Sequence, residues 1–156
     1  RDFCLSRGLG DVYKRQNENN QTAERRDFVY RIAVLTPSAV RGQDCVRHIT
    51  RFCREVGRFP QVAWYADEPS FFAAAHTEPP SGAVILLPGV EGLNAAEHLR
   101  AVYPECGLLW CSDLDFSLHA FRLRADYFWM EPMSPEKLRQ GLEAWLENTK
   151  RGGITR

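Results

Sequence analysis

Three features that would narrow the function at once are missing from the 156 residues of this chain. There is no excess of charge, because 20 Lys and Arg residues are matched by 20 Asp and Glu residues, which argues against nucleic-acid binding through bulk charge. The most apolar segment, Ala83–Leu87, ends at Pro88 and is far shorter than the roughly 20 residues that span a bilayer. The five cysteines are odd in number and show no paired spacing, which argues against a disulfide framework and a zinc site. What remains is the composition of an ordinary soluble globular domain.

The first residues do not read as native protein. The chain begins with Arg1, and residues 6–16 read SRGLGDVYKRQ, which is the translation of a transposon-based sequencing adapter. We therefore expect residues 1–16 to be an adapter scar and exclude them from the fold. Residues 17–28 are polar without an apolar period, so a disordered lead-in is expected there. Residues 29–149 are then expected to form one domain, and residues 150–156 a tail.

From Tyr30 onward, short apolar runs alternate with amphipathic stretches. The apolar runs predict five strands, over Tyr30–Leu35, Gln61–Tyr65, Ala83–Leu87, Gly107–Cys111 and Asp126–Met130. Helical spacing predicts helices over residues 42–57, 69–76, 93–102 and 113–123, and a last one from Ser134 to the pair Gly152-Gly153. In the helix over 113–123, the side chains expected to be buried are Leu114, Leu118 and Phe121. This alternation predicts an α/β fold, a flavodoxin-like three-layer sandwich with a five-stranded parallel sheet in the order 2-1-3-4-5.

Several segments resemble one known family. The run FSLHAFRLRADYFWMEPMSPEKL, residues 116–138, resembles the end of a response-regulator receiver (CheY-like) domain, in particular of the LytTR class. The segments YRIAVLTPSA and AVILLPGVEGLNAAEHLR resemble the first strand, and the third strand with its loop and helix, of the same family. The resemblance covers about Tyr30 to Asn148. It implies a cis Glu131-Pro132 peptide bond, because receivers commonly hold a Lys-Pro bond there in the cis form.

The resemblance also implies where phosphotransfer chemistry would lie. An active receiver accepts a phosphoryl group on an Asp after the third strand and binds Mg²⁺ through an acidic pair after the first. A hydroxyl after the fourth strand and a Lys after the fifth then hold the phosphate. The residues at the matching positions are Thr36 and Pro37 for the acidic pair, Leu87 for the phosphoacceptor, Cys111 for the hydroxyl, Glu131 for the Lys, and Phe128 for the switch aromatic.

Each of these replacements removes part of the chemistry. A Leu side chain has no nucleophile, a Thr-Pro pair supplies no carboxylate for Mg²⁺, and Glu131 would repel a phosphoryl group. A degenerate pseudo-receiver without enzymatic activity, cofactor or metal is therefore expected. The four histidines, His48, His76, His98 and His119, show no metal-binding spacing.

Two surface features leave alternatives open. In the receiver family the fourth helix, fifth strand and fifth helix usually form the partner face, which here implies Arg122, Arg124, Trp129 and Met133. Trp129 either packs under a helix or is exposed as an interface anchor. A stripe of arginines at helical spacing is either a solvated face or a site for an anionic partner; it comprises Arg47, Arg51, Arg54 and Arg58.

Three functions follow from these features. The first is a phosphorylation-independent regulatory and dimerisation module of a two-component-type transcriptional regulator. That module would be cytoplasmic, with a homodimer or another regulator as partner, no membrane association, and a possible C-terminal DNA-binding domain outside this chain. The alternative is a small-molecule sensor with an apolar strand-end cleft lined by Leu87, Cys111, Phe128 and Met130. The second alternative is an active phosphoacceptor receiver.

Overall fold

The computed structural model describes residues 30–155, and the side chains of residues 30–150. The expected adapter scar (1–16) and lead-in (17–28) lie outside the described residues. Five strands and five helices alternate along the described part of the chain. They are β1 (Arg31–Leu35), α2 (Ala39–Glu55), β2 (Gln61–Tyr65), α3 (Glu68–Thr77), β3 (Gly82–Leu86), α4 (Gly89–Val102), β4 (Gly107–Ser112), α5 (Ser117–Arg122), β5 (Tyr127–Met130) and α6 (Pro135–Thr155).

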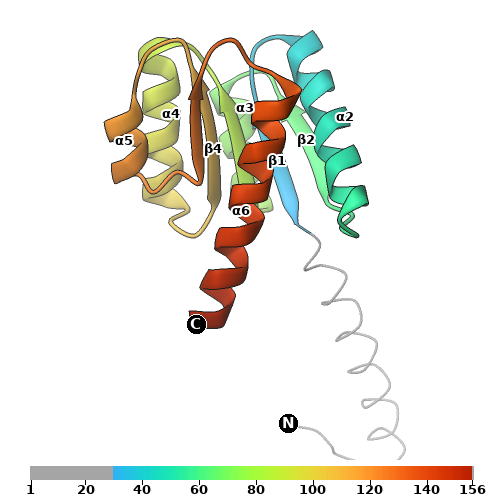
Figure 1. The fold of residues 1–156 in the computed structure, drawn as a ribbon. Coiled ribbons are helices and arrows are strands. Elements are labelled where there is room, and N and C mark those ends of the chain that lie inside the picture. Colours follow the sequence, from blue (N-terminus) through green and yellow to red (C-terminus); the bar gives the residue numbers. More distant parts are fainter. Residues whose placement is uncertain (1–29, 156) are drawn as a thin grey trace, which may run out of the picture.

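The strands form one parallel sheet in the order β2-β1-β3-β4-β5, as the alternation predicted. Helices α2 and α6 cover one face of this sheet, and α3, α4 and α5 cover the other (Figure 1). Because all strands run in the same direction, their carboxyl ends meet at one edge of the sheet. The residues expected to form the functional site lie at this edge.

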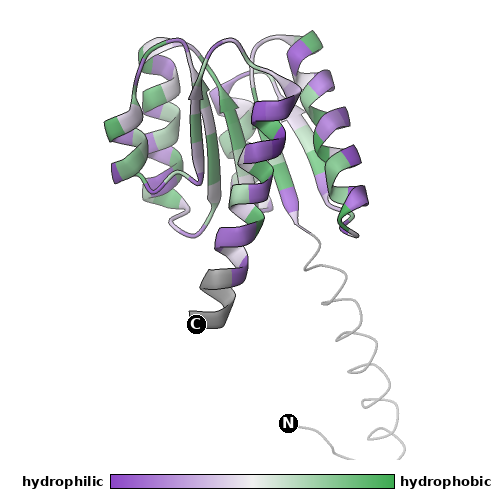
Figure 2. Cartoon of the chain, in the orientation of Figure 1, coloured by the Kyte–Doolittle hydropathy of each residue, from purple (hydrophilic) through white to green (hydrophobic). Residues whose placement is uncertain are grey.

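Both faces of β3 and β4 are buried along the whole length of the two strands. Alternate side chains of β3 and β4, such as Val84 and Leu109, join a cluster with α2 and α6. Their neighbours, such as Ile85 and Trp110, join a second cluster with α3, α4 and α5. Figure 2 shows the same division, with apolar strands inside and polar outward faces on the helices. The continuously apolar run that predicted a central strand is therefore confirmed as β3, at Gly82–Leu86.

Several helix boundaries differ from the prediction, and α2 runs from Ala39 to Glu55 rather than over 42–57. Helix α4 begins at Gly89 rather than at Leu93, so the expected loop over 88–92 forms its first turn. Gly92 permits this close turn, because a Cβ atom there would lie 2.4 Å from the carbonyl oxygen of Leu87. Helix α6 begins after Ser134 as predicted, with the Ser134 hydroxyl accepting from the Lys137 amide, but it continues past Gly152-Gly153 to Thr155. Glycine costs a helix only about 1 kcal/mol per residue, so the pair weakens the helix without ending it.

Helix α5 is shorter than predicted and faces the sheet with a different stripe. It has six residues, and Leu114, Leu118 and Phe121, which were expected to be buried, are 48%, 71% and 83% exposed. The buried stripe has the same helical spacing and comprises Phe116, Ala120 and Leu123. Phe116 stacks on Trp110 with ring centroids 5.5 Å apart. The small Ala120 side chain allows the helix to approach the sheet, and this packing turns Leu118 and Phe121 outward.

None of the described helices is long and apolar enough to cross a membrane.

Helix α6 packs closely over two strands through one large side chain. Trp145 is buried and lies against the first residues of β3 and β4, which are Gly82 and Gly107. A Cβ atom at Gly107 would lie 2.2 Å from Nε1 of Trp145, and one at Gly82 would lie 2.9 Å from Cζ2. The indole therefore occupies the space that two side chains would otherwise fill.

We expect Gly107→Ala to lower the free energy of unfolding by about 1–3 kcal/mol, because the added methyl group overpacks the Trp145 site. The measurement is urea unfolding monitored by circular dichroism. The Trp145→Phe background is the control, since a smaller ring makes room for the methyl group and reduces the effect of Gly107→Ala. Equal effects of Gly107→Ala in the two backgrounds would show that Trp145 is not the cause.

Candidate functional site

The structure brings the expected pocket positions to one edge of the sheet. Thr36 follows β1 and is buried, and Leu87 follows β3 and is 7% exposed. Ser112 ends β4, and its backbone carbonyl oxygen accepts a hydrogen bond of 2.9 Å from the amide of Glu131, the first residue after β5. Pro37 is exposed beside Thr36. The positions that the resemblance assigned to the pocket therefore lie at the same end of the sheet, at the carboxyl ends of the strands.

The register decides which polar side chain lies level with Leu87. Leu86 pairs with Cys111 across β3 and β4, so Leu87 lies level with Ser112, and Cys111 lies one residue earlier. The Ser112 hydroxyl is already engaged, because it accepts from the Leu114 amide at 3.2 Å and lies 3.4 Å from Oδ1 of Asp113. The edge therefore holds one apolar side chain beside a hydroxyl that is bonded to its own loop.

Cys111 is a buried thiol that points away from Leu87. It packs in the cluster with α2 and α6, whereas Leu87 packs in the cluster on the other face. Burial first, and the nearby Glu131 carboxylate second, raise the pKa of the Cys111 thiol to about 12 against a lowering effect of Arg41. Such a thiol is protonated and unreactive near neutral pH.

The four residues expected to line a strand-end cleft in the small-molecule sensor alternative do not all face the same space. Leu87 and Phe128 lie in the cluster with α3, α4 and α5, and Cys111 lies on the opposite face of the sheet. Met130 is 41% exposed. Alternation along β4 turns Cys111 to the face opposite Leu87 and Phe128, and Met130 lies exposed at the end of β5.

The most organised polar contact at this edge is an ion pair between Arg41 and Glu131. Arg41 lies in the first turn of α2 and Glu131 follows β5, so the pair joins elements that are far apart in the sequence. The contact is bidentate, with Nη1 to Oε2 at 2.9 Å and Nη2 to Oε1 at 3.2 Å. Oε1 of Glu131 also accepts from the Met133 amide at 3.0 Å, so the same carboxylate holds the turn that follows it.

The ion pair explains an unusual charge in α2. A cation in the first turn of a helix is unfavourable, because the amino end of the helix carries partial positive charge. Helix α2 has no acidic residue in its first turn, and the Ser38 hydroxyl caps it by accepting from the Arg41 amide at 3.3 Å. Glu131 supplies the missing negative charge from another element. Sequence reasoning missed Arg41; the available signal was a basic residue at a helix start together with an acid at a position where the family has Lys.

Other polar groups at the edge support loops and helix ends. Oδ1 of Asp113 accepts from the Gly89 amide at 2.7 Å, at the start of α4. Asp115 accepts from the hydroxyl and the amide of Ser117 at the start of α5, and these hydrogen bonds lower the pKa of its carboxyl group. The described residues contain no group of three or more His, Cys, Asp or Glu side chains that could hold a metal ion. The backbone is cis at Glu131-Pro132, as the resemblance implied.

The expected partner face is only partly exposed. Arg122 and Arg124 are exposed, and Met133 is half-buried. Trp129 is 5% exposed and packs in the cluster with α2 and α6, so its place on the partner face was wrong, and the alternative, packing under a helix, is confirmed. The reason is again strand alternation: Trp129 and Tyr127 point to the α6 side, whereas Phe128 points to the other and meets Trp110 at 5.1 Å.

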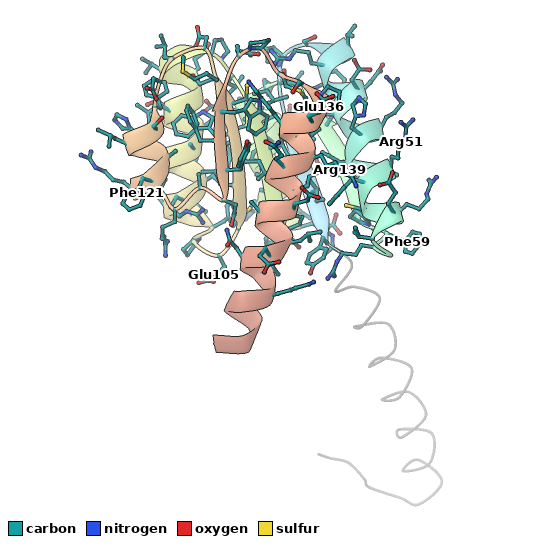
Figure 3. The ribbon with its side chains drawn as sticks, viewed as in Figure 1. Arg51, Phe59, Glu105, Phe121, Glu136 and Arg139 are labelled. Carbon is teal, nitrogen blue, oxygen red and sulfur yellow. The ribbon has the colours of Figure 1, made fainter. Side chains whose placement is uncertain are left out.

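The exposed apolar side chains near this face are Leu118 and Phe121, which we call the α5 ridge. Their positions three residues apart place them on one side of α5. Figure 3 shows Phe121 pointing from α5 into solvent. In the sequence-predicted stripe, Arg47, Arg51 and Arg54 are exposed along α2, and Arg47 pairs with Asp44. Arg58 lies after the end of α2, is half-buried and donates to the Tyr30 hydroxyl at 3.0 Å.

No family model and no curated protein sequence matches this chain. Solved structures do match its fold. A two-component transcriptional regulator AraC from Clostridium phytofermentans ISDg is 16% identical with a TM-score of 0.64, over 81% of this chain and 99% of that one. A LuxR-family two-component response regulator from Aurantimonas sp. SI85-9A1 is 24% identical with a TM-score of 0.63, over 77% and 86%. A CheY-like response regulator receiver domain protein from Methanospirillum hungatei JF-1 is 19% identical with a TM-score of 0.60, over 80% and 98%. The fold is therefore that of CheY-like receivers.

We expect the Arg41–Glu131 pair to contribute at most about 1 kcal/mol to the free energy of unfolding, because both side chains are about one-third exposed. Glu131→Lys should cost more than Glu131→Gln, because it places a second cation beside Arg41. The doubly changed protein Arg41→Glu/Glu131→Arg should recover most of the loss. Urea unfolding of the four proteins tests this, and a Glu131→Lys protein as stable as Glu131→Gln would contradict the pairing.

Proposed function

We propose that this chain is a receiver-like module that acts without phosphorylation and binds a protein partner constitutively, within a two-component-type transcriptional regulator. The observation that carries the proposal is the strand-end edge, where Leu87 occupies the phosphoacceptor position and Glu131 occupies the Lys position and is paired with Arg41. An input that adds a phosphoryl group needs a nucleophile, a divalent cation and a free positive charge there. The matching positions hold Leu87 in place of the nucleophile and Glu131 in place of the cation. Thr36 and Pro37 stand where carboxylates would bind Mg²⁺.

The α5 ridge supports a protein partner, and a second copy of this chain is the partner we favour. Leu118 and Phe121 are large apolar side chains at 71% and 83% exposure, on a helix whose other side already packs on the sheet. Charges of both signs border the ridge, with Arg122 and Arg124 at its end and Asp115 before it. A surface that carries an apolar centre and both charges is self-complementary, as a twofold dimer requires.

The regulator itself is proposed by likeness. The AraC and LuxR regulators among the structural neighbours are described as transcriptional or response regulators, which is consistent with a DNA-binding partner domain for this one. The LytTR character suggested by the sequence belongs to the same proposal. An active phosphoacceptor stays as the competing function and is separated by experiment.

Acetyl phosphate with Mg²⁺ should add no phosphoryl group to the protein, as measured by intact mass. Leu87→Asp alone should also fail to give a stable phosphoprotein, because the Glu131 carboxylate repels the group and no acidic pair binds Mg²⁺. An active receiver domain treated in parallel is the positive control. A mass gain of one phosphoryl group in the unchanged protein would instead support the active-receiver alternative.

Phe121→Ser should weaken self-association at least about tenfold, because truncating an interface aromatic commonly costs more than about 1.4 kcal/mol. Sedimentation-velocity ultracentrifugation over a concentration series measures the dissociation constant. Phe59→Ser is the matched control, because Phe59 is 68% exposed at the end of α2, far from α5 in Figure 3. An equal effect of the two changes, or a monomer at all concentrations, would move the partner surface away from the α5 ridge.

A further inference from the structure

A cavity of about 310 Å³ lies between α3 and the β1–β2 side of the sheet. The cavity opens to solvent at Ala63, which is exposed, and its lining is mainly apolar because small side chains of the sheet and of α3 leave space between the two layers. Those small side chains are Ala33, Ala63, Ala74 and Ala75. The rings of Phe71 and Tyr65 also line it, 5.9 Å apart in an edge-to-face arrangement. The volume lies at the lower end of the roughly 300–1,000 Å³ of ligand pockets, so only a small molecule fits.

One charged side chain in the wall of this cavity is incompletely bonded. Nε of Arg31 is buried and has no hydrogen-bond partner. Its Nη2 atom lies 3.4 Å from Oε2 of Glu78, a side chain that is 62% exposed. A contact of that length to an exposed carboxylate is weak. A buried donor without an acceptor is costly, so the guanidinium has capacity for a stronger partner.

A second, larger cavity lacks such a group. It measures about 640 Å³, lies at the amino ends of β3 and β4, and is lined by Arg100, Asp126 and Asn148 among others. Arg100 donates to the carbonyl oxygens of Leu123, Pro104 and Cys106, and Asn148 donates to Asp126. Its main polar groups are therefore satisfied within the protein, and the smaller cavity is the better candidate site.

We propose that the cavity under α3 binds a small monocarboxylate with a short apolar chain. The carboxylate takes the place of Glu78 beside Arg31 and accepts from Nη2 and, once the departure of Glu78 uncovers it, from Nε, in the side-on geometry that guanidinium groups make with carboxylates. The apolar chain occupies the space among the four alanines, and Glu78 yields its weak contact to the ligand. A cationic ligand is disfavoured by Arg31, and a neutral one gains no charge-assisted bond. This site is separate from the strand-end edge and does not depend on the regulatory role proposed above.

Octanoate is the probe, and isothermal titration calorimetry with the full chain is the measurement. We expect saturable one-site binding and a ligand-dependent rise of the melting temperature. In a protein with ¹³C-labelled alanine methyl groups, the shifts should concentrate on the alanines of the cavity. The compounds 1-octanol and octylamine, which have the same chain without the carboxylate, should bind at least about tenfold more weakly.

Two variants test the site from independent directions. Ala63→Leu fills the cavity, and Arg31→Gln removes the cation; each should weaken octanoate binding at least about tenfold. The matched controls are Ala101→Leu and Arg54→Gln, which make the same changes at exposed positions of α4 and α2 and should leave binding unchanged. If Arg31→Gln fails to fold, Arg31→Lys keeps the charge, removes Nε and should still weaken binding. No saturable binding, undiminished binding by Ala63→Leu, or equal binding of octylamine would overturn the proposal.

Discussion

The need to bury both faces of β3 and β4 is the constraint on which the rest of the structure depends. Every residue of these two strands is buried, so helices must cover the sheet on both sides. Parallel strands need crossover connections, and the helices that make these crossovers are the ones that cover the faces. One consequence is geometric: the carboxyl ends of all five strands meet at one edge. The residues that follow β1, β3, β4 and β5 become neighbours there although the sequence separates them widely.

The same constraint explains how much of the fold the sequence could predict. Continuous apolar runs and helical stripes are local patterns, and they placed all five strands to within about a residue or two at each end. The predicted buried face of α5 was wrong because that segment contains two apolar stripes of equal spacing, one with Leu118 and one with Ala120. Which stripe packs on the sheet depends on Trp110 of β4, because its ring stacks on Phe116. Spacing alone carries no information about that tertiary contact.

The candidate site divides in the same way. The departures from the receiver pattern at Leu87 and Glu131 could be identified from the sequence, because the family resemblance assigns each of these positions a chemical role. The ion pair between Arg41 and Glu131 could not be predicted from the sequence, because the two residues are 90 positions apart and no sequence motif links them. The burial of Trp129 could be predicted only in part. Alternation along β5 fixes which side chains share a face, but the position of α6 decides which face is covered.

Under the proposed function, the Arg41–Glu131 pair explains how a receiver-like fold persists without phosphotransfer chemistry. Receivers place carboxylates after the first strand and a cation after the fifth, and here the cation lies after the first strand and the carboxylate after the fifth. The Coulomb attraction between the two elements has the same sign in either arrangement, so the pair can still hold the β5–α6 turn to α2. What changes is the charge offered to a ligand. A cation on a free-standing Lys attracts a phosphoryl group, whereas the Arg41 guanidinium is committed to Glu131 by two hydrogen bonds. The edge thereby keeps a structural contact between its elements and gives up the free charge that a phosphorylation switch requires.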